Sequence, residues 1–181
     1  YKCIQSELGY RSVSPMPSPQ VRLDQYKEKY YQADASNYRQ EYSAEELRYF
    51  NNDGRVTERV MSQHTKAGPG RLLDVGAGEG FFAKHFLDSG WDTTIADDSS
   101  AGMGLQNPTL LSSLLQEDLF QTIEQLAKEQ EKYDLISLRN VLEHVIDPIK
   151  LLSDINSLIA SGGILRINVP NDYSKIQHFL L

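Results

Sequence analysis

Three glycines at alternate positions separate an apolar run from a helix-like stretch, in the sequence DVGAGEG at residues 74–80. Glycine at Gly76, Gly78 and Gly80 permits a positive φ in a tight turn and leaves the backbone open to a ligand. Ala77 lies within the same loop and is grouped with these candidates. The third glycine comes one residue earlier than in the dinucleotide fingerprint G-x-G-x-x-G. The spacing therefore favours a nucleoside ligand that carries no pyrophosphate.

Acidic residues follow the next two apolar runs. Asp97 and Asp98 come about twenty residues after the glycine turn, where a carboxylate can accept hydrogen bonds from both hydroxyls of a ribose. Taken alone, either residue could equally be a solvated loop acid or a helix cap. Asp118, in the stretch QEDLF, is placed to accept a hydrogen bond from the exocyclic amine of a purine, with Leu119 and Phe120 as apolar neighbours of the ring.

His144, with Glu143 beside it, is the candidate for proton transfer. Histidine titrates near neutral pH and can take a proton from a hydroxyl group. A structural alternative stays open, in which His144 ends a strand and hydrogen-bonds the following loop.

These residues must be positioned by the elements around them, and apolar strand-like runs alternate with helix-like runs from residue 71 onward. The predicted strands span residues 71–76, 91–97, 110–118, 133–140 and 164–171, and the predicted helices span residues 79–89, 122–132 and 147–161. The stretch 110–118 could equally be helical. Five strands joined by helical crossovers predict an α/β fold with a parallel sheet wrapped by helices on both faces. Ligands of such sheets bind beyond the carboxyl ends of the strands, where the candidate residues lie.

Local cap signals support this division. Ser99 and Ser100 are placed to cap a helix after the second strand. Pro148 falls in the first turn of the last helix, and a glycine pair at residues 162–163 is expected to follow its end.

The segment before the sheet is expected to be an arm and a helical lead-in. Ser43 and Glu46 form a capping-box pattern at the start of residues 43–68, which Gly54 is expected to break into two helices. Residues 12–20 contain three prolines and three serines and are expected to lack regular structure. We therefore predict an N-terminal arm at residues 1–42 and a catalytic-type domain at residues 43–181. The tyrosines of the arm, Tyr30, Tyr31, Tyr38 and Tyr42, either form a lid over the ligand or only cover the sheet.

Taken with the stretches YDLISLRNVLEHVIDP and LIASGGILRINVPN, these motifs resemble the class I S-adenosylmethionine-dependent methyltransferases. The closest likeness is to the group with a Leu-Glu-His-Val signature after the fourth strand, and it covers about residues 70–172. The resemblance implies a Rossmann-like fold, S-adenosylmethionine as the cofactor and S-adenosylhomocysteine as its product. By the same resemblance, Asp74 and the loop at residues 76–80 face the methionine part of the cofactor, and Asp97 faces its ribose.

The remaining roles follow from the same likeness. Asp118 with Leu119 would face the adenine, and Asn140 with Val141 would lie along the cofactor near the acceptor. Some relatives carry the fuller pattern Glu-x-x-Glu-His, which is associated with a divalent cation. Asn140 stands here at the position of the first glutamate, and asparagine is a poorer ligand for a hard cation than a carboxylate. We therefore predict no metal site.

Both ends of the chain differ from the fuller pattern of the group. Some members carry a cysteine-rich zinc knuckle before the domain, and the first fifteen residues resemble a remnant of one, with Cys3 retained. One thiol cannot hold zinc alone. The class I fold normally adds an antiparallel hairpin after the fifth strand, and that hairpin is expected to be missing from this chain, which makes the domain C-terminally incomplete. Residues outside the chain, the N-terminal arm or a partner would then cover the edge of the sheet.

Composition narrows the possible partners. The 181 residues carry a formal net charge of −7, with 40% hydrophobic and 24% charged residues. This charge argues against a general nucleic-acid-binding surface, and no apolar run is long enough for membrane insertion. A single cysteine indicates a reducing compartment, so we expect a cytoplasmic protein with a small-molecule acceptor.

The leading hypothesis is an enzyme that transfers a methyl group from S-adenosylmethionine to an oxygen, nitrogen or carbon of a small molecule. O-methylation is slightly favoured because His144 is available. Two alternatives stay open: a non-catalytic module that binds a nucleoside cofactor, and a nucleotide-dependent oxidoreductase on a related sheet. The early third glycine disfavours the oxidoreductase. The acceptor and the oligomeric state are left open by the sequence.

Overall fold

The computed structural model describes residues 2–5, 7, 11–18, 21, 39–65 and 68–171, and the chain divides into two compact units, residues 1–39 and 40–181. The first unit contains an antiparallel pair of strands, β1 (Lys2–Gln5) and β2 (Arg11–Ser14). The prediction that residues 12–20 lack regular structure is wrong for residues 12–14, because the first proline comes only at Pro15 and leaves the preceding N–H groups intact. Tyr30, Tyr31 and Tyr38 of the predicted lid lie outside the described residues.

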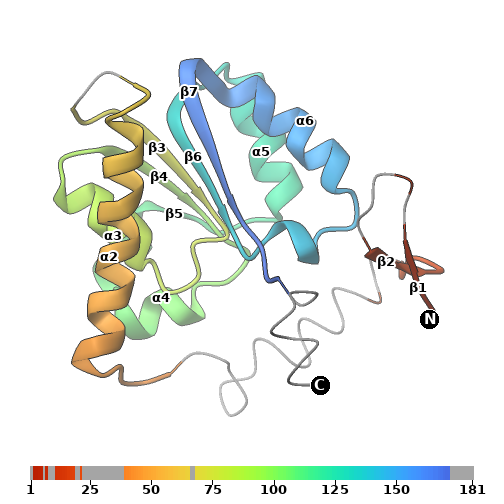
Figure 1. Ribbon diagram of the computed structural model, residues 1–181, viewed down its shortest axis with the longest axis horizontal. Helices are drawn as coiled ribbons and strands as arrows, with labels where there is room; N and C mark the ends of the chain where they lie inside the picture. Colours follow the sequence, from red (N-terminus) through yellow and green to blue (C-terminus); the bar gives the residue numbers. More distant parts are fainter. Residues whose placement is uncertain are drawn as a thin grey trace. The chain divides into compact units, whose positions relative to one another are not determined.

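The second unit is built on a five-stranded sheet (Figure 1). Its strands are β3 (Arg71–Val75), β4 (Asp92–Ala96), β5 (Leu114–Leu115), β6 (Tyr133–Arg139) and β7 (Ile159–Asn168). They pair in the order β5-β4-β3-β6-β7, and every pair is parallel. The predicted α/β fold with a parallel sheet is confirmed. The strand order reverses between β3 and β6, so the topological switch point lies at the carboxyl ends of these two strands.

Helices cover both faces of the sheet because side chains alternate along each strand. The helices α5 (Leu119–Lys128) and α6 (Pro148–Leu158) lie on one face, and α2 (Ala44–Met61) and α3 (Phe81–Asp88) lie on the other (Figure 1). The core under α5 and α6 includes Leu73, Val75, Ile136, Leu138, Ile123 and Ile155. The core under α2 and α3 includes Leu72, Leu135, Met61, Phe82, Phe86 and Trp91. None of the described helices is long and apolar enough to cross a membrane.

Helix α2 begins at the predicted capping box. The Ser43 hydroxyl accepts a hydrogen bond from the Glu46 N–H at 3.2 Å, and the Glu46 carboxylate accepts one from the Ser43 N–H at 2.9 Å. The predicted break at Gly54 is wrong, since α2 runs through this residue. A Cβ at Gly54 would lie 2.3 Å from Cδ2 of His85 on α3. The glycine therefore marks a close approach of two helices.

The predicted third strand is mostly wrong. Residues 108–113 form a 3₁₀ helix (Pro108–Ser113), and only Leu114–Leu115 pair with β4. The helical alternative for this stretch therefore holds for its first half, where Leu110 is buried and Leu111 is exposed. The helix before it, α4 (Ala101–Gln106), is preceded by the two predicted cap residues. Only Ser99 makes a capping bond through its side chain, accepting from the Ala101 N–H at 3.1 Å.

The last helix and strand meet earlier than expected. Helix α6 ends at Leu158 rather than residue 161, and β7 starts at once at Ile159 and ends at Asn168 rather than residue 171. The glycine pair consequently lies inside β7, where the pairing with β6 shifts register. Gly162 has φ +78°, and a Cβ at Gly163 would lie 2.9 Å from the Tyr133 carbonyl oxygen. These glycines accommodate an irregular strand, which the cap interpretation missed.

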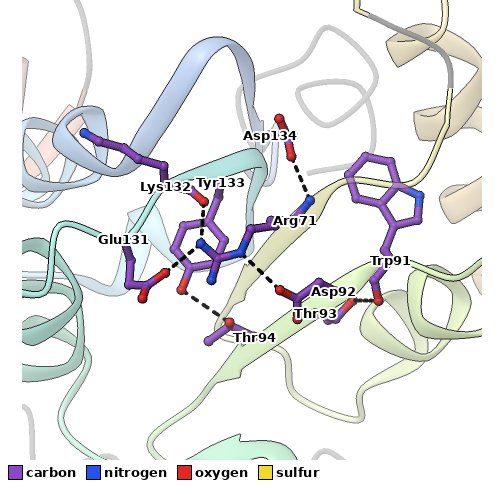
Figure 2. A network of polar contacts seen from close by, with 9 residues as sticks. All are labelled: Arg71, Trp91, Asp92, Thr93, Thr94, Glu131, Lys132, Tyr133 and Asp134. Atoms are coloured by element: carbon purple, nitrogen blue, oxygen red, sulfur yellow. Dashed lines mark hydrogen bonds and ion pairs between the residues drawn. The ribbon is translucent and has the colours of Figure 1, made fainter.

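A network of polar contacts fastens the amino ends of the central strands (Figure 2). The Arg71 side chain hydrogen-bonds Asp92 on β4 at 3.1 Å and the Lys132 carbonyl oxygen at 3.0 Å, and it pairs with Glu131 at 2.6 Å. The Arg71 backbone N–H also donates to Asp134 at 2.8 Å. One arginine therefore joins β3, β4 and the entry to β6.

Candidate functional site

The glycine loop after β3 has the backbone that its sequence predicts. Gly76, Gly78 and Gly80 have φ values of 69°, 58° and 78°. The Gly76 N–H donates to the Ala96 carbonyl oxygen at 2.8 Å, which ties the loop to the end of β4. A Cβ at Gly76 would lie 2.2 Å from Cγ2 of Val141, the buried residue that follows β6 by two positions. Both the positive φ and the close approach of Val141 therefore require glycine here.

Asp97 lies directly after β4 and holds this loop. Its Oδ2 accepts a hydrogen bond from the Gly78 N–H at 2.7 Å, and its Oδ1 accepts one from the Ser99 N–H at 2.9 Å. Burial raises the pKa of Asp97, and the two backbone donors oppose that rise. A carboxylate has about four acceptor positions, so two of them stay available for ribose hydroxyls. Asp98, the second candidate at this position, is exposed.

Two side chains from other elements fix Glu79, within the same loop. The Tyr42 hydroxyl donates to Oε1 of Glu79 at 2.5 Å, and the Asn107 side-chain amide donates to the Glu79 carbonyl oxygen at 2.7 Å. The Tyr42 ring packs edge-on against Phe50 and Phe81, with centroids 5.1 and 5.7 Å away. Tyr42 is the described member of the predicted tyrosine lid, and it contacts the loop itself.

Asp74 lies two residues before the loop and is 1% exposed. It pairs with Ser137 on β6, which pairs with Arg166 on β7, so the three residues form one row across adjacent strands. Burial raises the pKa of Asp74 to about 6, although the positive charge of Arg139 acts in the opposite direction. The Oδ2 atom of Asp74 has no hydrogen-bond partner.

Three charged residues near Asp74 were missed by the sequence analysis. Asp53 of α2 pairs with Arg166 at 2.6 Å and with Arg139 at 3.4 Å. Both guanidinium groups lie over the ring of Phe82, at 4.9 Å for Arg166 and 5.2 Å for Arg139. We use the name polar layer for the set Asp53, Asp74, Ser137, Arg139 and Arg166. The signal that could have revealed it is a polar residue at every second position near the ends of two apolar strands.

The segment after β6 carries the other predicted site residues. Asn140 has φ +53° and its N–H donates to the Asn168 carbonyl oxygen at 2.9 Å. His144 ends a short 3₁₀ helix (Leu142–His144), where its N–H donates to the Val141 carbonyl oxygen and its Nε2 lies 3.7 Å from Oε1 of Glu143. Across the described residues, no group of three His, Cys, Asp or Glu side chains could hold a metal ion.

Asp118 has a structural role that the sequence analysis did not consider. It is exposed and caps α5, with Oδ1 accepting a hydrogen bond from the Gln121 N–H at 3.1 Å. Leu119 begins that helix and packs against the core beneath it. The Asp97 N–H donates to the Leu115 carbonyl oxygen at 3.3 Å, so β5 does end beside the candidate site. Adenine contacts by Asp118 and Leu119 stay a prediction.

Two cavities in the described part of the chain lie elsewhere. One of about 210 Å³ is lined by residues such as Met61, Pro69 and Trp91, near the amino ends of the strands. Another of about 580 Å³ is lined by α2 residues and His85. The glycine loop and Asp97 line neither cavity. The candidate site is therefore identified by its place at the switch point and by its hydrogen bonds.

Comparison with known proteins shows the family to which this chain belongs. Residues 38–180 match the methyltransferase domain family. The chain is 27% identical over 123 residues to a ubiquinone biosynthesis O-methyltransferase of Stutzerimonas stutzeri strain A1501, covering 67% of this chain and 53% of the relative. A protein of the same name from Xanthomonas campestris pv. campestris strain B100 is 32% identical over 103 residues, covering 56% of this chain and 43% of the relative. The chain thus spans about half the length of these curated relatives.

Solved structures agree on the fold. A SAM-dependent methyltransferase from Archaeoglobus fulgidus superimposes with a TM-score of 0.55 at 19% identity, covering 72% of this chain and 59% of that one. The plantazolicin methyltransferase BpumL, in complex with SAH, gives a TM-score of 0.55 at 17% identity, covering 82% of this chain and 58% of that one. The match over residues 38–180 confirms the resemblance inferred from the sequence, and the chain belongs to the methyltransferase domain family of class I S-adenosylmethionine-dependent methyltransferases.

Proposed function

We propose that this chain binds S-adenosylmethionine at the carboxyl ends of β3, β4 and β6 and transfers its methyl group to a hydroxyl oxygen of a small molecule. The observation that supports the site best is the glycine loop at the topological switch point. Asp97 fixes this loop by accepting a hydrogen bond from the Gly78 N–H. Gly76, Gly78 and Gly80 present backbone without side chains, and Asp97 keeps acceptor positions for the ribose. The O-methyltransferase names of the curated relatives support oxygen as the acceptor atom.

The chemistry asks for alignment more than for reactive side chains. When bound, the cofactor supplies a methyl group activated by a sulfonium leaving group. The acceptor oxygen forms a bond to the methyl carbon while the carbon–sulfur bond breaks, and the hydroxyl proton leaves to a base. Holding the acceptor in line with the methyl group can supply much of the rate. Val141 and Asn140, which follow β6 beside the loop, are placed to bound that approach.

His144 is the proposed base. It lies four residues beyond Asn140, and its Nε2 is 3.7 Å from the Glu143 carboxylate, which would stabilise the ring after it takes the proton. In this role Glu143 positions and stabilises the imidazole and does not contact the acceptor.

Titration calorimetry with S-adenosylhomocysteine and with NAD tests the cofactor assignment. We expect S-adenosylhomocysteine to bind and NAD not to bind. NAD binding alone would overturn the assignment in favour of a nucleotide-dependent oxidoreductase. Turnover is then measured on a panel of dihydroxybenzenes with S-adenosylmethionine. Binding of S-adenosylhomocysteine without turnover on any of these acceptors would favour the non-catalytic module.

His144→Ala tests the base. A positioned general base contributes about 10²- to 10⁴-fold in rate, so we expect kcat to fall in that range while affinity for S-adenosylhomocysteine is kept. Glu143→Gln should give a smaller fall, because it leaves the imidazole in place. An unchanged rate for His144→Ala would return His144 to the structural role suggested by its backbone bond to Val141.

A further inference from the structure

A hollow of about 580 Å³ beside α2 is lined by side chains that can all donate hydrogen bonds. Neither the glycine loop nor Asp97 lines it, so it is separate from the proposed methyl-transfer site. Two of its lining groups are guanidinium groups, and none is a carboxylate. A ligand rich in acceptor oxygens would therefore suit it. The lining residues are Arg48, Asn51, Asn52, Arg55 and His85.

The spacing of these residues explains how the hollow forms. The four lining residues of α2 follow the pattern i, i+3, i+4, i+7, which places them on one face of the helix. Seven residues of α-helix rise by about 10 Å, so Arg48 and Arg55 stand at the ends of this row and the two asparagines lie between them. His85 of α3 completes the hollow because Gly54 has no side chain. A Cβ at Gly54 would lie 2.3 Å from Cδ2 of His85.

The guanidinium groups of the hollow are available to a ligand. Within the described ranges, no hydrogen bond or ion pair joins the Arg55 side chain to another residue. Arg48 lies 3.7 Å from Oε1 of Glu45, in a pair whose side chains are 72% and 87% exposed. Such an exposed pair contributes little and is easily exchanged for another partner. The carboxylate of Glu58, next to the hollow, already lies 3.0 Å from Nε2 of His85.

The chemistry of these donors favours phosphate oxygens. A planar guanidinium forms paired hydrogen bonds with phosphate, and the asparagine amides add neutral donors between the two arginines. A row about 10 Å long, with a cation at each end, fits a chain of phosphate groups better than a single one. The formal net charge of −7 disfavours general attraction of anions, so binding here must depend on these particular contacts.

We infer that this hollow binds the polyphosphate group of a soluble small molecule. Arg48 and Arg55 pair with its two end phosphates, and the amides of Asn51 and Asn52 donate to the oxygens between them. The site goes beyond the proposed methyl transfer and does not depend on it. Exposed Tyr49 and Val56 follow two of the lining residues along α2, so an anionic lipid surface is the competing ligand. A hollow favours the soluble group, because a flat bilayer would meet the convex side of the helix.

Titration calorimetry with tripolyphosphate and orthophosphate as probes tests the inference on the 181-residue chain, in buffer free of divalent cations. We expect tripolyphosphate to bind more tightly than orthophosphate. Arg55→Met should weaken tripolyphosphate about tenfold, as expected for the loss of a charge-assisted hydrogen bond. Arg55→Lys keeps the charge but loses the fork and should fall between wild type and Arg55→Met. Asn52→Ala, which leaves the charge unchanged, should weaken binding a few-fold.

The matched control is Arg59→Met, which removes the same charge from the next turn of α2, outside the hollow. It should change the Kd for tripolyphosphate by less than about twofold. Equal weakening by Arg55→Met and Arg59→Met would overturn the inference, because diffuse attraction does not distinguish the two positions. Arg55 and Arg59 are both exposed, and circular dichroism checks that each variant keeps its helix content.

Two further outcomes would also overturn the inference. One is the absence of tripolyphosphate binding to the wild-type chain. The other is sedimentation with phosphatidylglycerol vesicles that depends on Arg55 while tripolyphosphate does not bind, which would assign this face of α2 to a lipid surface. Neither outcome affects the proposed methyl transfer, which titration with S-adenosylhomocysteine tests separately.

Discussion

The two ends of the central sheet use arginine in opposite ways. At the amino end, Arg71 meets Asp92, Glu131 and a backbone carbonyl oxygen, and the hydrogen bond to Glu131 is the main cause of its raised pKa (Figure 2). At the carboxyl end, Arg166 has Asp53 as its ion-pair partner, its Nη1 lacks a hydrogen bond, and burial lowers its pKa. Arg71 therefore contacts groups on β4 and in the segment before β6, whereas Arg166 keeps one buried N–H group without a hydrogen bond.

This difference separates a partly exposed polar network from a buried one. The amino-end network is half-exposed, and water can complete whatever the protein leaves unpaired. The carboxyl-end layer includes Asp53 of α2 and packs on Phe82 of α3, and a partner for its buried atoms has to come from the protein, from a trapped water or from a ligand. Matched substitutions, one at each end of the sheet, test this contrast.

The largest expected effect is that of Gly76→Ala. The alanine must keep a positive φ, which costs about 1–2 kcal/mol. Its Cβ would lie 2.2 Å from Cγ2 of Val141, so that side chain must move, at a cost of about 1–3 kcal/mol more. We therefore expect the free energy of unfolding, from urea denaturation, to fall by about 2–5 kcal/mol. Gly90→Ala, near the amino end, has φ +86° but meets only Pro69, at 3.7 Å, and should cost about 1–2 kcal/mol. Equal losses at the two glycines would contradict the role assigned to Val141.

Asp74→Asn should stabilise the protein above the pKa of Asp74. The pKa of Asp74 is raised from 3.8 to about 6, so the folded state binds the proton more tightly than the unfolded state. Stability therefore falls as pH rises through this window and is level above it. The raised pKa corresponds to a loss of up to about 3 kcal/mol in the free energy of unfolding at pH 7.5. Asp74→Asn should recover up to that amount and flatten the pH dependence between about pH 4 and 6, measured by urea denaturation across pH.

The matched substitution at the amino end is Asp92→Asn. Asp92 is exposed and pairs with Arg71, so its replacement should change the free energy of unfolding by less than about 1 kcal/mol. A loss of stability in Asp74→Asn at pH 7.5 would mean that attraction to Arg139 outweighs burial. In that case the layer would be a satisfied structural network like the one around Arg71.

The comparison also shows what the sequence could reveal. Local features could be predicted from the sequence, because a capping box, a glycine turn and an apolar period each depend on residues that lie close together in the chain. The capping box at Ser43 and the glycine loop follow the expected geometry for this reason. Gly54 was misread because its partner, His85, lies 31 residues away in the sequence, and a close approach of two helices leaves no local signal.

The polar layer was missed for a related reason. Asp53 and Arg166 are 113 residues apart, and their pairing depends on how α2 docks on β7. The glycine pair in β7 was also misread, because glycine serves equally well after a helix and in a bulged strand, and only the register shift with β6 decides between them. The meeting of the carboxyl ends of β3, β4 and β6 at one edge of the sheet was predicted correctly. Parallel strands bring these ends together whatever the conformation of the loops.

Tyr42→Phe tests the hydrogen bond that joins Tyr42 to Glu79 of the glycine loop. It removes the hydrogen bond to Glu79, measured at 2.5 Å, but keeps the ring packed on Phe50 and Phe81. A hydrogen bond to a charged group contributes about 1.5–3 kcal/mol, and partial exposure should reduce this to about 1 kcal/mol of unfolding free energy. We also expect affinity for S-adenosylhomocysteine to fall a few-fold. Unchanged affinity would show that Glu79 does not help to shape the loop.

Arg71→Met carries the smallest expected effect and completes the comparison. The side chain is 39% exposed, and its pairs with Asp92 and Glu131 are of the kind that contribute about 0.2–1 kcal/mol each. The free energy of unfolding should fall by about 1 kcal/mol, and this loss should shrink in high salt because exposed charges are screened. Affinity for S-adenosylhomocysteine should stay at the wild-type value, because the network lies at the far end of β3 from the glycine loop. A loss of affinity without a loss of stability would show that the two ends are coupled through β3, and the contrast between the two ends of the sheet would no longer hold.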